Sequence, residues 1–230
     1  MEGVFHWTSV IPVVKEVPDH VATACLVVGG ITIGSIFAAR ALKRAENPII
    51  PEKKLSLRNF FEILIEFVYN LVGNTVGASP DKYFPLLGAF FIYILFNNLM
   101  GVIPGFSPPT SNINTNVAIA AVSFLMYNYY GFQAHGWKYI KQFMGPLIWI
   151  APLMFVIELF SHMFRPISLS IRLFGNMFGD HMVLGIFSGL VPLVVPVVFL
   201  VLAIVVSLLQ AFVFTLLSTV YIGLAISHDH

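Results

Sequence analysis

Long apolar runs are the feature that most constrains the fold of this chain. Of its 230 residues, 58% are hydrophobic and only 10% are charged, whereas ordinary globular domains carry about 25% charged residues. Several runs reach the twenty or so residues that let a helix cross a hydrocarbon core of about 30 Å. They lack the alternation that a membrane barrel strand requires. The sequence therefore predicts an all-α integral membrane protein, with a single membrane domain over residues 1–230.

The distribution of basic residues predicts the orientation. Lys and Arg collect in cytoplasmic loops, and a basic cluster follows the first predicted span, residues 20–42. We therefore expect the N-terminal segment, residues 1–19, to lie outside and the C-terminus to lie in the cytoplasm. Lys15 is the one basic residue expected on the outer side. Nine residues fall on the predicted inner side: Arg40, Lys43, Arg44, Lys53, Lys54, Arg58, Lys82, Lys138 and Lys141.

Residues 56–78 are predicted to form an amphipathic helix with Ser56 as its N-cap. One stripe of this helix is polar, and it consists of Arg58, Glu62, Glu66 and Asn70. We interpret the helix as lying at the membrane interface or pairing with a neighbour. A role for Glu62 or Glu66 in ion passage is the alternative.

The remaining apolar sequence predicts a helical hairpin over residues 83–132 and two long helices over residues 145–226. Prolines and uncharged polar residues separate the two arms of the hairpin. The two long helices exceed the length of an upright span, and we infer that they are strongly tilted, because tilting accommodates excess length.

Arg172 lies inside this last apolar region, with no acidic residue three or four positions away. An arginine at the bilayer centre costs about 2.5–3.5 kcal/mol on insertion scales, so it needs water, a partner or a function. On an ideal helix one polar face passes through Glu158, His162, Arg165, Arg172, Asn176 and Asp180, while His181 falls on the opposite side. A ladder of ion pairs that holds helices together is one explanation for Glu158, His162 and Arg165; for Arg165 alone, snorkelling to headgroups is another.

Arg172 still lacks a counter-charge in this sequence, which favours a carboxylate on another subunit. Gln210, the one amide of the last apolar segment, lies opposite Arg172 if the two long helices pack antiparallel.

No motif indicates an enzyme, a metal site or a cofactor. The chain has neither a phosphate-binding G-x-x-x-x-G-K-[ST] nor a zinc-binding H-E-x-x-H. Its lone Cys25 fits no metal-ligand spacing, and no basic run interleaved with aromatic residues suggests nucleic acid.

Four segments resemble the subunit a family of the F-type ATP synthases, the stationary part of the membrane proton path. The most specific is S-L-S-I-R-L-F-G-N-M from Ser168 to Met177, followed by L-L-Q-A-F-V-F from Leu208 to Phe214. N-L-M-G-V-I-P from Asn98 and P-T-S-N-I-N from Pro109 are also similar to family segments.

The resemblance implies that Arg172 is the family's essential arginine, facing the carboxylates of a rotating c-ring, and that the two long helices line this ring. Flanking polar positions are Asn176 and Gln210. We assign to the cytoplasmic half-channel Glu158, Ser161, His162 and Ser168, and to the outer half-channel Asn98, Asn114, Asp180 and His181. The chain departs from some relatives at three positions: they carry glutamate at His181, a histidine or an acid at Ala203 and aspartate at Gly101.

The function expected from this resemblance is that of a non-catalytic, proton-conducting subunit in a bacterial inner membrane. Its expected partners are the c-ring, the b subunits of the peripheral stalk and the F1 sector, together with membrane lipid and protons. An independent channel or secondary transporter, with Arg172 binding an anionic substrate, is the alternative, and a purely structural membrane scaffold is the third hypothesis.

Overall fold

The structure is a computed structural model that describes residues 17–44, 56–77, 80–103, 105–139, 151–190 and 194–227. Within these ranges every regular element is helical, which confirms the predicted all-α fold. The α-helices are α1 (Asp19–Arg44), α2 (Leu57–Val76), α3 (Pro80–Leu99), α4 (Ile113–His135), α6 (Ala151–Leu190) and α7 (Val194–Ile226), and the 3-10 helices are η3 (Met100–Val102) and η4 (Pro109–Ser111).

Four of the described helices are long and apolar enough to cross a membrane, as expected for an integral membrane protein. These segments are Asp19–Lys43, Pro80–Val102, Pro152–Phe187 and Pro196–Ile226. Several predictions fall outside the described residues: the outer segment up to residue 16, the basic residues Lys53, Lys54 and Lys141, and the tail from residue 228.

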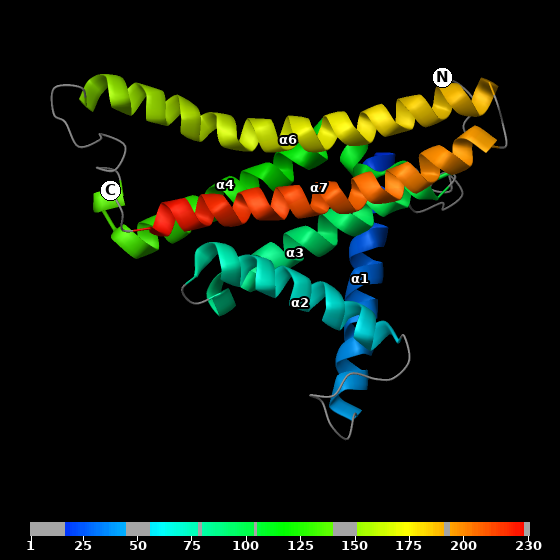
Figure 1. Cartoon of the computed structure of the whole chain (residues 1–230), viewed down its shortest axis with the longest axis horizontal. Coiled ribbons are helices and arrows are strands. Elements are labelled where there is room, and N and C mark those ends of the chain that lie inside the picture. The colour runs from blue at the N-terminus through cyan, green and yellow to red at the C-terminus, as the bar shows by residue number, and fades with distance from the viewer. Residues whose placement is uncertain are drawn as a thin grey trace.

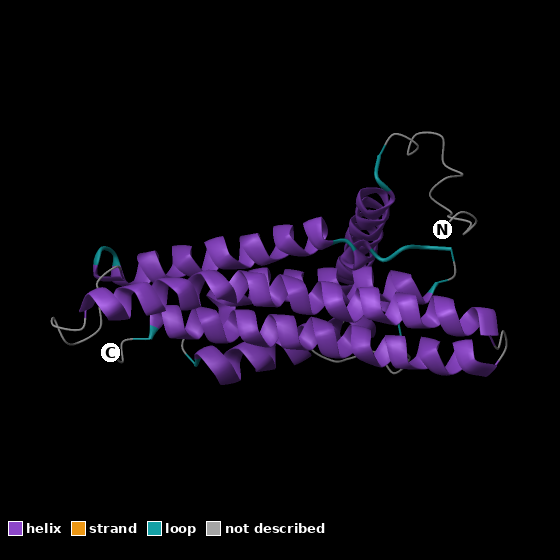
Figure 2. Cartoon of the chain, turned by 90° about the horizontal axis from the view of Figure 1, so that it is seen from above, coloured by secondary structure: helices purple, strands orange, loops and turns teal. Residues whose placement is uncertain are grey.

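The two longest helices follow the same general direction and pack against each other along part of their length, with α6 extending beyond the C-terminal end of α7 (Figure 1). Helix α6 has 40 residues and α7 has 33, so they measure about 60 and 50 Å at 1.5 Å per residue. Helices α2, α3 and α4 follow the same general direction, whereas α1 runs across it (Figures 1 and 2). If α1 crosses the membrane upright, α6 and α7 are therefore strongly tilted relative to the membrane normal.

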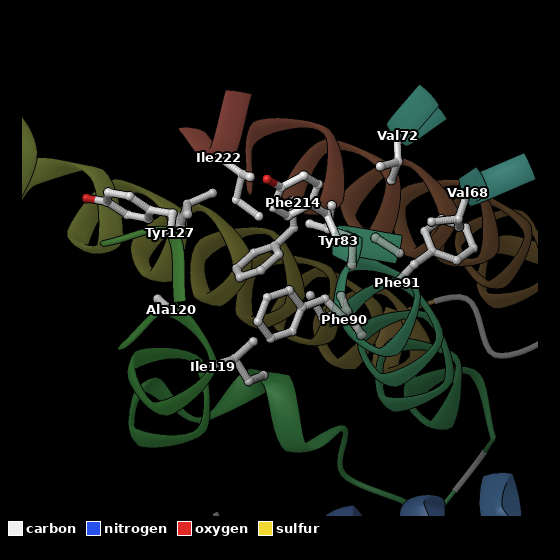
Figure 3. Packing of buried hydrophobic residues seen from close by; sticks show 14 of the residues in the cluster. Val68, Val72, Tyr83, Phe90, Phe91, Ile119, Ala120, Tyr127, Phe214 and Ile222 are labelled. Atoms are coloured by element: carbon white, nitrogen blue, oxygen red, sulfur yellow. The ribbon is translucent and has the colours of Figure 1, made fainter. Parts of the chain in front are cut away.

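Aromatic rings from distant parts of the sequence form the core. Phe90 of α3 and Phe214 of α7 point toward each other and meet edge to face, with 5.8 Å between ring centroids (Figure 3). The same buried cluster contains Val72 of α2, Ile119 of α4 and Leu173 of α6. Because lipid tails are as apolar as these side chains, close packing rather than escape from water stabilises the cluster within a membrane.

Hydrogen bonds order the segment between α3 and α4. The Thr110 hydroxyl donates to Oδ1 of Asn98 at 2.6 Å, and Nδ2 of Asn116 donates to the carbonyl oxygen of Thr110 at 2.7 Å. All three side chains are almost fully buried. Asn112 caps α4 and also lies 3.3 Å from Nδ1 of His20, which joins the start of α1 to this segment. These bonds provide partners for polar groups that a lipid environment would leave unsatisfied.

Helix α2 begins directly after Ser56, whose hydroxyl oxygen accepts a bond from the backbone N–H of Asn59 at 3.4 Å. Arg58 is 3% exposed and its Nε lies 2.7 Å from Oε1 of Glu62. Glu66 is exposed. The polar stripe of α2 thus contains a close internal ion pair, which fits a helix that packs against its neighbours.

Candidate functional site

Arg172 lies on the side of α6 that faces away from the rest of the chain. Leu169, Leu173 and Met177, spaced four residues apart, are at most 3% exposed and turn the opposite side of the helix into the core. Arg172 itself is exposed. Within the described part of the chain, no acidic group forms an ion pair with its guanidinium and no group forms a hydrogen bond with it.

Small residues follow Arg172 on its helix. A Cβ atom added at Gly175 or Gly179 would meet no atom within 4 Å, so the space over both glycines is open. Glycines at such positions let a second helix approach a membrane helix closely. This part of α6 therefore combines an unpaired cation with an accessible backbone.

Asn176 and Gln210 join α6 to α7 one turn beyond Arg172. Nδ2 of Asn176 donates to Oε1 of Gln210 at 2.7 Å. Gln210 is 3% exposed, so its amide depends on this partner within the chain. The sequence predicted both residues as flanking polar positions, and their direct bond was not foreseen.

Three of the four residues predicted for the outer half-channel line one small recess of about 20 Å³, the Asn98 recess. Its wall includes Asn98, Gly101, Asp180, His181, Ala203 and Ser207. Nδ2 of Asn98, Oδ2 of Asp180 and Nε2 of His181 are buried there, and none has a hydrogen-bond partner among the described residues. Apolar atoms make up most of the wall, but the unpaired buried donors and acceptors offer hydrogen-bond partners to a water molecule.

Asn114, the fourth residue of that set, does not line the recess. It is exposed in the first turn of α4, where its backbone N–H donates to Oδ1 of Asn112 at 2.9 Å. Asp180 and His181 lie on different sides of an ideal helix, yet both reach the recess because α7 and the α3–α4 segment surround this part of α6.

Gly101 gives His181 its space within the recess. A Cβ atom at Gly101 would lie 2.9 Å from Nε2 of His181 and 3.0 Å from Cγ of Pro108. Both distances are shorter than ordinary contacts, so a side chain at residue 101 displaces the imidazole. The absence of a side chain at Gly101 therefore leaves the room that the imidazole of His181 occupies.

Of the residues predicted for the cytoplasmic half-channel, His162 contacts α4 toward the C-terminal end of that helix. His162 is 5% exposed, and its Nε2 lies 2.9 Å from Oδ1 of Asn128 on α4. Because an amide oxygen only accepts hydrogen bonds, Nε2 is the donor. The Tyr139 hydroxyl donates to the same oxygen at 3.3 Å. Ser161 and Ser168 are exposed, and the Ser168 hydroxyl donates to the backbone carbonyl of Arg165.

Glu158 and Arg165 face each other along α6. Nη2 of Arg165 lies 3.9 Å from Oε1 of Glu158, whose side chain is 41% exposed. Arg165 also lies over the Tyr221 ring of α7, with its Cζ 5.0 Å from the ring centroid. Glu158 and Arg165 thus form a pair within α6, whereas His162 bonds to an amide of α4, so no ladder of ion pairs joins these helices among the described residues.

Sequence reasoning missed Asn128, Tyr127, Tyr221 and Ser207 as parts of these clusters. Asn128 had a detectable signal, since it is an amide within the apolar stretch of a predicted span. The other three are ordinary residues in an apolar helix, and only packing reveals their neighbours. In the described ranges no group of three or more His, Cys, Asp or Glu is arranged to hold a metal ion.

Comparison with known proteins agrees with these features. The family model described as ATP synthase A chain matches residues 22–223. ATP synthase subunit a of Bdellovibrio bacteriovorus is 47% identical over 98% of this chain and 99% of its own length. Proteins of the same name from Geotalea uraniireducens and Geobacter sulfurreducens are each 42% identical over 92% of this chain and 89% of their own. The chain therefore belongs to the ATP synthase subunit a family.

Proposed function

We propose that the chain is the stationary proton-conducting subunit of its synthase, with two offset half-channels that reach the carboxylates of a c-ring near Arg172. The observation that carries this proposal is the unpaired guanidinium of Arg172 on the outward side of α6. A permanent cation at membrane depth needs a counter-charge, and none of the described residues of this chain supplies one.

The charge of Arg172 gives it two tasks in this mechanism. It favours the ionised form of a ring carboxylate that arrives beside it, and it repels a proton that would pass straight from one half-channel to the other. Protons therefore cross only as the ring turns and carries them as neutral carboxylic acids. Each elementary charge that moves through the membrane field supplies about 2.3 kcal/mol per 100 mV.

The two clusters of polar residues suit the ends of such a path. The Asn98 recess combines Asp180, His181 and an amide, so water held there connects titratable groups with the outer side. Glu158, half-exposed near the opposite end of α6, receives protons for release to the cytoplasm, with Ser161, His162 and Ser168 beside this route. Asn114, exposed at the start of α4, contributes to the outer entrance rather than to the recess wall.

The same proposal assigns this chain its partner subunits and its membrane. The c-ring covers the exposed apolar sides of α6 and α7, the b subunits contact the chain elsewhere, and the F1 sector performs the catalysis, so this chain is non-catalytic. The membrane is a bacterial inner membrane, with the N-terminus outside and the C-terminus in the cytoplasm. A transporter that binds an anion at Arg172 is disfavoured, because Arg172 does not line the Asn98 recess.

Replacement of Arg172 tests the proposal directly. The complete synthase carrying Arg172→Ala, reconstituted in liposomes, should make no ATP when a pH gradient and a membrane potential are imposed. Arg40→Gln, which removes an exposed cation from α1, is the matched control and should make ATP at the normal rate. ATP synthesis at the normal rate in Arg172→Ala would reject the proposal.

A further inference from the structure

Arg165 is the second cation within the α6 span, and the surrounding residues hold it in one position. Its side chain is 21% exposed and contacts three neighbours. Its guanidinium lies over the ring of Tyr221 on α7 at 5.0 Å and over that of Tyr127 on α4 at 6.0 Å. On its own helix it faces Glu158 at 3.9 Å.

The two tyrosines form a rigid support for this cation. Tyr127 is 1% exposed, and its ring centroid lies 6.0 Å from that of Tyr221 and 5.0 Å from that of His162. In Figure 3 the hydroxyl end of Tyr127 points away from the apolar cluster around Phe90 and Phe214. The ring thus lies at the boundary between the packed core and the polar groups of α6.

Contact with the face of an aromatic ring favours a guanidinium over a lysine ammonium, and the attraction increases when the pair is shielded from water. Snorkelling requires a side chain that extends toward headgroups, whereas Arg165 turns toward α4 and α7. A simple surface ion pair would leave both partners mobile. Here one partner is fixed and the other, Glu158, is half-exposed.

We propose that Arg165 is a positioning residue, which, supported by Tyr221 and Tyr127, orients the carboxyl group of Glu158 at the end of the cytoplasmic half-channel. This inference rests on the proposed function, because it assigns to Glu158 the proton release described above. Among the described residues, the charged and titratable groups around Glu158 are Arg165 and His162 on α6, Tyr127 on α4, Tyr139 just after α4, and Tyr221 on α7.

The test measures ATP-driven acidification of inverted membrane vesicles that contain the complete synthase, normalised to the amount of c-ring. Arg165→Gln should lower the initial rate by about two- to fivefold, the effect of losing one partly exposed ion pair. Arg165→Lys should restore at least half of the rate, because the charge returns although the guanidinium contact with the tyrosine rings does not. Arg40→Gln serves as the control for the loss of a cation.

The Glu158→Gln background separates positioning from general stabilisation. If Arg165 acts through Glu158, the double variant Glu158→Gln with Arg165→Gln should be no slower than Glu158→Gln alone. Should Arg165→Gln fail to assemble, Tyr221→Leu provides the same test, since it removes the support and leaves both charges. Its loss of rate should also disappear in the Glu158→Gln background.

Three results would overturn the inference. They are a normal rate in Arg165→Gln, losses that multiply in the double variant, and a normal rate in Glu158→Gln. An Arg172→Ala variant in the same series distinguishes a failure of this inference from a failure of the proposed function. If it remains inactive while any of these results is obtained, only the role of Arg165 is refuted; if it pumps normally, the proposed function fails as well.

Discussion

Nδ2 of Asn176 donates a 2.7 Å hydrogen bond to Oε1 of Gln210, and this bond joins α6 to α7 one turn beyond Arg172. Gln210 is almost fully buried, whereas Asn176 lies on the exposed side of α6. The bond therefore links the outward surface that carries the arginine to the interior of the helix pair. It fixes the position of α7 relative to Arg172.

Removal of this bond should slow proton pumping without preventing assembly. Interhelical hydrogen bonds in membranes contribute about 0.6 kcal/mol on average, so Asn176→Ala and Gln210→Ala should each lower the pumping rate by about threefold. The double variant should be no slower than the more impaired single variant. Ser123→Ala breaks a 2.9 Å bond between α4 and α7 elsewhere and should pump normally. Independent, multiplying losses at Asn176 and Gln210 would show that the bond does not couple them.

The sequence predicted the fold well because the strongest constraints on it are local. Apolar length predicted the membrane helices, Ser56 indicated the start of α2, and the prolines after Ile103 indicated the end of the first hairpin arm. The sequence also indicated that the adjacent turns of α6 supply no acid to Arg172, because no acidic residue lies three or four positions from it.

The sequence did not indicate which residues line the Asn98 recess or which residues contact Arg165. Asp180 and His181 line the same recess only because η3, η4 and α7 surround that part of α6. Arg165 meets Tyr221 across two helices, and a helical projection of α6 contains no information about α7. Contacts between helices depend on their crossing and register, which single-sequence periodicity does not determine.

A side chain at residue 101 should impair the outer path through His181. The added methyl group of Gly101→Ala would lie 2.9 Å from Nε2 of His181, so the imidazole must rotate away. We expect slower ATP synthesis in liposomes after an acid–base jump. Gly29→Ala is the matched control, because an added Cβ at Gly29 meets nothing within 4 Å.

A His181→Ala background identifies the route of this effect. Gly101→Ala should cause no additional loss once the imidazole is absent. An equal loss in both backgrounds would assign the effect to Pro108, the other close neighbour of residue 101. It would contradict the prediction that Gly101→Ala acts by displacing His181.

Truncation of Phe214 should reduce stability rather than transport by the folded protein. Phe214 is 0% exposed and packs against Phe90 at 5.8 Å. Phe→Ala costs about 3–5 kcal/mol in soluble cores. We expect a smaller loss of stability here, because a phenylalanine ring in a membrane stays in an apolar environment even when the helices separate. Thermal unfolding in detergent should therefore occur at a lower temperature for Phe214→Ala and change less for Phe214→Leu. Phe37→Ala, at an exposed position on α1, is the control, and an equal shift in both alanine variants would contradict the prediction.

Filling the Asn98 recess should block the outer path without removing any titratable group. Ala203 lines the recess together with His181 and Ser207, and the larger side chain of Ala203→Leu would occupy space that water needs to reach the unpaired atoms of Asn98, Asp180 and His181. We expect Ala203→Leu to lose most of its proton-driven ATP synthesis, while Ala203→Ser, which adds only a small polar group, keeps most of it. Ala39→Leu on the exposed side of α1 controls for added volume in a membrane helix. Normal synthesis by Ala203→Leu would mean that protons reach the ring without passing through this recess, and the outer half-channel would then have to run along another surface of α6.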